Sequence, residues 1–327
     1  MSEVLVLHVA DSALEPIYSQ ILLAFAEAGL DSDFFREDQS LPEQFLGKKV
    51  VVDIGGWGRK EHVAAATAAG VQLWHVVGYG LDHLALDDVM SSGIPLSRTP
   101  GTTTAIPLAE HAMFLLLAIA KRAKSAPEAL VEQHFFDGDA LELAGRTIAI
   151  IGLGTSGREL ALRAKAFGMR VIGVDVVDVP PEQLASLGVE RCHRIEDLLD
   201  VLAESDVVSL HLPLNSQTRH VLDATALARL KPGGIVLNVA RGPLIDEDAL
   251  IASLQSGHLG GAGLDVFEVE PLPLDSPLFA LPNVVITPHW AAATLETMAR
   301  RARLAAENVQ LALAGQPARY RVLPEHL

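Results

Sequence analysis

Three glycines follow a short β-branched apolar run at 147–151 and precede an alanine- and leucine-rich segment. In this G-x-G-x-x-G pattern, Gly152 permits a tight turn, Gly154 lets the backbone approach a pyrophosphate, and Gly157 lets a helix pack closely on a strand. The helix that follows offers free N–H groups and the positive end of its dipole to phosphates. The pattern predicts dinucleotide binding, and a glycine-rich turn that holds no ligand is the alternative.

An aspartate stands where such a site needs a carboxylate. The apolar run 170–174 ends in Asp175, about 20 residues beyond the glycines, where a carboxylate binds the ribose hydroxyls of adenosine. No Arg or Lys follows until well past Pro181, so a 2′-phosphate at Asp175 would meet no nearby cation. NAD is therefore expected rather than NADP, with a solvated strand end as the alternative for Asp175 alone.

Later apolar runs are followed by an arginine, a glutamate and a histidine that could together assist the reduction of a carbonyl group. Arg241 has a planar guanidinium group that can donate two parallel hydrogen bonds to one carboxylate. His289 can give a proton to a carbonyl oxygen near neutral pH, and Glu270 can orient that imidazole and favour its protonated form. Taken singly, these residues fit a structural ion pair, a loop residue and a turn residue. Asp265 either fixes Arg241 or the nicotinamide region, or caps a strand.

These residues require a sheet whose strands all end at one edge. Strands are expected at 147–151, 171–174, 207–211, 235–239, 262–265 and 284–287, with helices between most of them. This alternation predicts an α/β fold with a doubly wound parallel sheet, in which the residues after each strand converge. Residues 108–118 form an apolar helix expected to lie between domains, and its His111 is expected to be a hydrogen-bonded core residue.

The first hundred residues alternate in the same way and predict a second, smaller parallel sheet. Strands are expected at 4–9, 49–54, 72–77 and 94–97, and Ser12 opens a capping box for the first helix. The glycine-rich loop at 55–58 must hold something or bend sharply. The last helix, 295–314, is expected to return to this domain. The predicted domains are 1–101 with 295–327 for substrate binding and 102–294 for NAD binding.

The composition of the chain limits which partners, bound groups and locations are expected. The chain has 327 residues, half of them hydrophobic, which suggests two domains with large cores. A net charge of −16 argues against nucleic acid and anionic membranes as partners. The single Cys192 excludes an internal disulfide and a cysteine-based metal cluster, and no metal is expected. No basic leader precedes the first strand, and the longest apolar stretch, 112–120, is too short to span a bilayer, so a soluble cytoplasmic protein is expected.

Over nearly its full length the chain resembles the D-isomer-specific 2-hydroxyacid dehydrogenases, the family of D-lactate, glyoxylate/hydroxypyruvate and phosphoglycerate dehydrogenases. The matching stretches are 78–84, 98–100, 108–111, 152–157, Asp175, 211–214, 238–242, 264–267 with 270–271, and 288–289. The resemblance implies two Rossmann-like domains, an active site in the cleft between them, and a homodimer formed through the NAD-binding domains.

The resemblance also assigns roles to residues. It implies that Arg241 orients a 2-oxo acid and that Glu270 and His289 form the acid–base pair. The N–H groups of Tyr79 and Gly80 would hold the substrate carboxylate. Together with the glycine loop, the NAD site would be lined by Thr99, Thr155, Ser156, Asp175, Pro213, Ala240 and Asp265.

Departures from the family pattern bear on the substrate. An Arg-Ser-containing loop, frequent in phosphoglycerate dehydrogenases, is replaced here by 55–58, and no regulatory C-terminal domain follows, so phosphoglycerate is disfavoured. Glu270 stands where formate dehydrogenases have Gln, which disfavours formate. Trp57 and Trp290 either shape a pocket for an apolar or compact side chain or serve in packing, while Arg59 and Lys60 could offer charge.

Two rival functions remain open at this point. One is a non-catalytic protein that senses NAD redox state through the same fold, and the other is a different reductase chemistry on the same scaffold.

Overall fold

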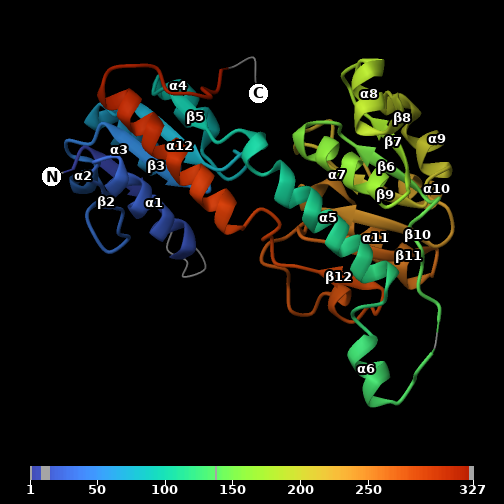
Figure 1. Cartoon of the computed structure of the whole chain (residues 1–327). Coiled ribbons are helices and arrows are strands. Elements are labelled where there is room, and N and C mark those ends of the chain that lie inside the picture. The colour runs from blue at the N-terminus through green and yellow to red at the C-terminus, as the bar shows by residue number, and fades with distance from the viewer. Residues whose placement is uncertain (1, 9–14, 137, 324–327) are drawn as a thin grey trace. The chain divides into compact units, whose positions relative to one another are not determined.

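The computed structural model describes residues 2–8, 15–136 and 138–323, so the capping box at Ser12 lies outside the described residues. The chain divides into two compact units, Met1–Thr103 with Ala293–Leu327, and Thr104–Ala292. Each unit is built on one parallel sheet (Figure 1). No helix in the described ranges is both long and apolar enough to cross a membrane.

The first unit contains a five-stranded sheet in the order β2-β1-β3-β4-β5, with every pair parallel. Its strands are β1 (Val4–Leu7), β2 (Asp33–Phe34), β3 (Val50–Ile54), β4 (Leu73–Val77) and β5 (Leu96–Arg98). The expected strands therefore formed, and the two-residue β2 was missed. Because β1 and β3 lie side by side, the strand order reverses between them, and loops after these strands are placed where ligands bind in such sheets.

Helices cover both faces of this sheet. The helices are α1 (Glu15–Glu27), α2 (Leu41–Phe45), α3 (Lys60–Ala69), α4 (Leu86–Ser92) and α12 (Leu295–Leu313), with a 3-10 turn η2 at Gly101–Thr103. Figure 1 shows α12 lying beside α1, and the two helices share one apolar cluster with β1, β3 and β4. The C-terminal helix thus belongs to the first unit.

The second unit contains a seven-stranded sheet in the order β12-β11-β10-β9-β6-β7-β8, again with parallel pairs throughout. Its strands are β6 (Thr147–Ile151), β7 (Arg170–Val174), β8 (Val189–His193), β9 (Val207–Leu210), β10 (Gly234–Asn238), β11 (Leu259–Leu264) and β12 (Val284–Ile286). Six of these match expected strands, and β8 was missed. The order reverses between β6 and β9, which is where the glycine loop begins.

Two apolar clusters, one on each face, hold this sheet. On one face α5 (Ala105–Ala120) and α7 (Thr155–Ala166) pack on β6 and β10, and on the other lie α9 (Leu198–Ala203), α10 (Ala224–Arg229) and α11 (Glu247–Gln255). The remaining elements are α6 (Ala126–Val131), α8 (Pro181–Leu187), η3 (Ile195–Asp197), η4 (Gly242–Leu244) and η5 (Pro277–Phe279). Successive apolar residues of β6 point alternately into the two clusters, and every position of the strand is buried. Because both faces of the strand are covered, its sequence is a continuous hydrophobic run.

Candidate active site

The glycine loop joins β6 to α7, and a side chain would not fit at its first and third glycines. Gly152 has φ +98°, and a Cβ there would lie 2.5 Å from the carbonyl oxygen of His211. A Cβ at Gly157 would lie 1.9 Å from Gly152 O, so the close helix–strand packing predicted for this glycine is present. Gly154 directly precedes α7 and gives it no side-chain cap, and a Cβ there would meet no atom within 4 Å. The backbone is therefore open to a ligand at Gly154, beside the first N–H groups of the helix.

Asp175 stands at the end of β7 and is tied to the glycine loop. Its Oδ2 accepts a hydrogen bond from the Leu153 N–H at 2.7 Å, and its Oδ1 accepts one from the Val177 N–H at 3.0 Å. These two bonds fix the carboxylate next to the turn that would receive the pyrophosphate.

The expectation that no cation lies near Asp175 is wrong. Arg194 follows β8, which pairs with β7, and its guanidinium donates to the Val176 carbonyl and lies 3.4 Å from the Asp178 carboxylate. The chain brings this arginine back beside the loop after Asp175, although it is distant in sequence. Sequence spacing missed it because β8 itself was missed.

A neutral histidine lies behind the loop. Nδ1 of His211 is 3.0 Å from the Ser156 hydroxyl and Nε2 is 3.0 Å from the Ser209 hydroxyl. Burial lowers the pKa of His211 to about 4, so the ring is uncharged at neutral pH and links β9 to the first turn of α7. Thr155 is the first residue of that helix, and Pro213 is exposed beyond β9.

Arg241 lies in a turn that is fixed by the side chain of Asn238 and by the close packing of Gly242. The buried Asn238 at the end of β10 accepts from the Ala240 N–H at 3.0 Å and donates to the Arg241 carbonyl at 2.8 Å. A Cβ at Gly242 would lie 1.8 Å from Phe267 O, so the arginine turn packs directly on the loop after β11. Sequence reasoning gave Asn238 no role of its own, although an amide ending a buried apolar strand is a usable signal.

Glu270 and His289 form a hydrogen-bonded pair. Nδ1 of His289 is 2.8 Å from Oε2 of Glu270, and Oε1 accepts from the Phe267 N–H at 3.0 Å. Burial raises the pKa of Glu270, but the hydrogen bond and charge of His289, the Phe267 N–H and the charge of Arg241 outweigh it, so this pKa lies below its ordinary value. The three expected reactive side chains thus lie in one neighbourhood of the second unit.

Asp265 holds the loop that carries His289. Its buried carboxylate accepts hydrogen bonds from the Trp290 N–H at 3.1 Å and the Ala291 N–H at 2.8 Å, and its carbonyl accepts from the His289 N–H at 2.8 Å. His289 has φ +53°, a conformation that these bonds support. These contacts give Asp265 a role that the sequence did not predict, which is to hold the segment that carries His289. The Trp290 side chain is exposed.

The same carboxylate also accepts from the Thr287 hydroxyl, which lies 2.8 Å from Nε2 of His111 on α5. His111 is therefore a hydrogen-bonded histidine, as expected. Its pKa is lowered by burial, a shift that the charge of Asp265 partly opposes.

The other predicted site residues belong to the first unit. Tyr79 and Gly80 follow β4, and neither N–H donates a hydrogen bond within the described residues. The Arg98 guanidinium lies 4.5 Å above the Tyr79 ring and donates to the Tyr79 carbonyl at 3.1 Å. Thr99 is fully buried, and its hydroxyl donates to the Val76 carbonyl, so only its backbone and neighbours can face a ligand.

Trp57 is the aromatic residue of the loop after β3. Its indole is 43% exposed and stacks on the His83 ring at a centroid separation of 4.1 Å. Arg59 precedes α3, and the side chain of Lys60 extends toward Asp88 at 3.9 Å.

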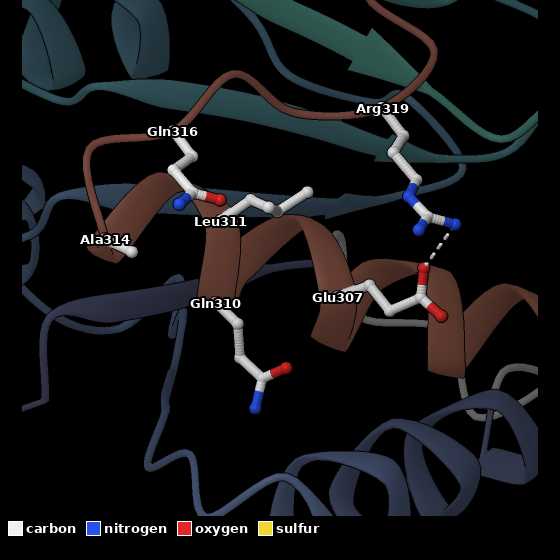
Figure 2. Close-up of a pocket in the computed structure, with 6 residues that line it drawn as sticks. All are labelled: Glu307, Gln310, Leu311, Ala314, Gln316 and Arg319. Carbon is white, nitrogen blue, oxygen red and sulfur yellow. Dashed lines mark ion pairs between the residues drawn. The ribbon is translucent and has the colours of Figure 1, made fainter.

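A hollow of about 330 Å³ lies elsewhere on the first unit, over the end of α12. Figure 2 shows its lining side chains, with Glu307 and Arg319 paired across it at 3.1 Å. None of the predicted site residues lines this hollow, so it adds nothing to the reactive group on the second unit.

A family model matches residues 113–291, and it describes the D-isomer specific 2-hydroxyacid dehydrogenase NAD binding domain. The hydroxypyruvate reductase of Thermotoga maritima is 37% identical over 307 residues, which cover 90% of this chain and 93% of the reductase. The D-3-phosphoglycerate dehydrogenase of Mycobacterium leprae is 40% identical over 254 residues, covering 77% of this chain. The chain spans about half the length of that relative, 47%.

A solved structure matches nearly the whole length of the chain. A D-isomer specific 2-hydroxyacid dehydrogenase from Xanthobacter autotrophicus Py2, in complex with NADPH and MES, superposes with a TM-score of 0.79. It is 32% identical, and the match covers 99% of each chain.

Proposed function

The chain belongs to the D-isomer specific 2-hydroxyacid dehydrogenase family, and from this premise we propose that it interconverts a 2-oxo acid and a D-2-hydroxy acid with NAD as cofactor. The observation that carries the proposal is the Glu270–His289 hydrogen bond, with the Arg241 turn packed against the glutamate's loop. Each side chain is of the type that carbonyl reduction requires.

The cofactor fits the residues present on the second unit. Gly154 leaves open space at the start of α7, where N–H groups can take a pyrophosphate, and Asp175 is held at the end of β7 for the ribose hydroxyls. A nicotinamide cofactor held by these residues would supply the hydride that carbonyl reduction requires. Thr155, Ser156, Pro213 and Ala240 are proposed to line the same site, whereas Asp265 acts by holding the His289 loop.

The chain's own groups handle the carboxylate and the proton. Arg241 binds the carboxylate and carbonyl side of the oxo acid, and the backbone N–H groups of Tyr79 and Gly80 add donors for the carboxylate. His289 gives its proton to the carbonyl oxygen during reduction and takes one from the hydroxyl in the reverse direction. Glu270 keeps Nδ1 engaged, so that Nε2 is the nitrogen that transfers the proton.

The test is NADH oxidation with glyoxylate, hydroxypyruvate, pyruvate, phenylpyruvate and branched 2-oxo acids. We expect at least one acid to be reduced to the D-hydroxy acid. Tight NADH binding without oxidation by any of these acids would favour the NAD-sensing rival instead.

We also propose that two copies associate through their NAD-binding units. Support comes from large apolar side chains left exposed on and after α5 of this unit: Ile106, Phe114, Leu130, Val131, Phe135 and Phe136. Val131 is 83% exposed and Phe136 is fully exposed, which is unusual for a surface that meets only water.

Sedimentation velocity tests this assembly. The double variant Val131→Asp with Phe136→Asp is expected to sediment as a monomer where the parent sediments as a dimer. Leu199→Asp, on α9 at the opposite face of the sheet, is the matched control and should stay dimeric. A parent that sediments as a monomer contradicts the proposal.

A further inference from the structure

Leu153, between the first two glycines of the loop after β6, is bonded at both of its backbone groups. Its N–H donates to Oδ2 of Asp175 at 2.7 Å, and its carbonyl accepts from Nε of Arg158 at 2.6 Å. Arg158 lies in the first turns of α7, whereas Asp175 directly follows β7. The residue is therefore held both from the helix and from the neighbouring strand.

The side chain of Leu153 provides a third anchor. It is buried and belongs to the apolar cluster that α5 and α7 share with the sheet. A Cβ at Gly173, within β7, would lie 2.3 Å from Cδ1 of Leu153, so the leucine packs directly on that glycine. These three anchors leave the backbone of Leu153 little freedom, although it lies between two glycines.

The bond from Arg158 also fixes the direction of the Gly154 N–H. The peptide that joins Leu153 to Gly154 is trans and planar, so its C=O and N–H point in opposite directions. Because the carbonyl is turned toward the Arg158 side chain, the N–H of Gly154 points away from it. Within the described residues this N–H donates no hydrogen bond, and a Cβ at Gly154 would meet open space.

A pyrophosphate is the group that such N–H donors at the start of a helix fit. The N–H groups of Thr155 and Ser156 lie in the first turn of α7, where the helix itself offers them no acceptor. An N–H that already points outward needs no reorientation when phosphate oxygens bind, so less conformational entropy is lost. Among the described residues no donor other than Arg158 bonds the Leu153 carbonyl, so this one bond sets the orientation.

We propose that Arg158 is a positioning residue for the dinucleotide, which holds the Leu153 carbonyl so that the Gly154 N–H faces the pyrophosphate. This role rests on the proposed NAD site of the second unit, and it does not depend on which acid is reduced. The rival explanation is a direct contact between the guanidinium charge and the pyrophosphate. The two differ in whether the hydrogen bond from Nε or the positive charge is needed.

Two variants of similar side-chain length separate the hydrogen bond from the charge. In Arg158→Gln, Nε2 of the amide stands at the same position along the side chain as Nε of arginine, so a donor for the Leu153 carbonyl remains while the charge is lost. Arg158→Met has neither the donor nor the charge. If Arg158→Met does not fold, Arg158→Ala removes the same donor and is well tolerated in a helix.

Isothermal titration calorimetry with ADP-ribose measures binding of the pyrophosphate without any catalysis, and adenosine, which has no phosphate, is the reference ligand. The Kd of ADP-ribose should rise about tenfold or more in Arg158→Met and stay within about threefold of the parent value in Arg158→Gln. The affinity for adenosine, measured by competition with NADH, should change in neither variant. Equal weakening of ADP-ribose in both variants would show that the charge acts directly, and equal weakening of adenosine and ADP-ribose in Arg158→Met would show a general structural role. Either result overturns the inference.

Arg163→Met is the matched control. Arg163 lies on the same helix, but its guanidinium bonds the carboxylates of Glu159 and Glu110 instead of the glycine loop. The variant removes the same charge from α7, so the Kd of ADP-ribose should stay that of the parent, and a rise equal to that in Arg158→Met would overturn the inference. A parent that does not bind ADP-ribose would defeat the proposed NAD site itself. A parent and an Arg158→Met variant that bind it equally well would defeat only the positioning role.

Discussion

The Nδ1 atom of His289 lies 2.8 Å from a carboxylate oxygen of Glu270, in the same loop region where His220 lies 2.9 Å from Glu268. The two pairs have the same chemistry and almost the same length. The charge of Arg241 lowers the pKa of Glu270 in the first pair, whereas Glu268 of the second pair is also bound by Arg219 at 3.1 Å. The second pair is therefore a natural control for the first.

Replacing the proton donor should abolish most turnover. His289→Gln keeps a hydrogen-bonding side chain but cannot donate a proton, so kcat for the best oxo acid should fall by about two to four orders of magnitude. NADH binding, measured by fluorescence titration, should be retained. His220→Gln should keep near-normal kcat, and near-normal kcat in His289→Gln would remove this residue from the mechanism.

The pH dependence of kcat/KM should depend on the negative charge of Glu270. The pKa of Glu270 lies below its ordinary value, so the carboxylate is mainly ionised above that ordinary value and places a negative charge 2.8 Å from Nδ1 of His289. In Glu270→Gln this charge is lost, and the basic limb of kcat/KM for oxo-acid reduction should move to lower pH by about one unit or more. Glu268→Gln should leave the limb in place. An unmoved limb in Glu270→Gln would show that the carboxylate does not act on the proton donor.

Cofactor preference should depend on Asp175 and on the arginine beside it. Asp175→Ala removes the group expected to repel a 2′-phosphate and leaves Arg194 near that position, so the ratio of kcat/KM for NADH over NADPH should fall about tenfold or more. Adding Arg194→Ala should reverse part of this change. Asp206→Ala, which removes a carboxylate bound to the Thr147 N–H at the other end of β6, should leave the ratio unchanged. An unaltered ratio in Asp175→Ala would mean that this carboxylate does not read the ribose.

Sequence alone predicted the elements whose apolar pattern is continuous. The run at β6 is buried at every position, and Gly152 and Gly157 after it are required by contacts below 3 Å, so both features left a clear pattern. Strand β8 was missed because it lies at the sheet edge and carries two adjacent exposed charged residues, Glu190 and Arg191, which interrupt any apolar pattern. The position of Arg194 depends on that strand and was lost with it.

Residues that act through backbone hydrogen bonds were also harder to predict. Asp53 lies inside an otherwise apolar strand, and two of its three donors are N–H groups of a loop whose path no local pattern gives. Asn238 and Asp265 likewise act through backbone groups, since the Asn238 amide bonds the Arg241 carbonyl and the Asp265 carboxylate bonds the Ala291 N–H. The reactive residues were predictable because their types and strand-end positions are informative, whereas these supports depend on the folded path.

Stability of the first unit should fall in mild acid because of His75. This histidine on β4 is fully buried, with Nδ1 2.8 Å from the Ser97 hydroxyl and 3.3 Å from Nδ2 of Asn308 on α12. Burial lowers its pKa to about 4. Between pH 6.5 and 4 the unfolded chain therefore binds a proton that the folded chain does not, and the free energy of unfolding falls as the pH falls, by up to about 1.4 kcal/mol per pH unit.

His75→Asn keeps a polar atom near the Nδ1 position but does not titrate, so its unfolding free energy, measured by urea denaturation across this window, should decline less steeply than that of the parent. His211→Asn provides the comparison, since the same loss should there affect the second unit. Parallel pH dependence in the parent and His75→Asn would show that the buried ring is not a source of the acid sensitivity.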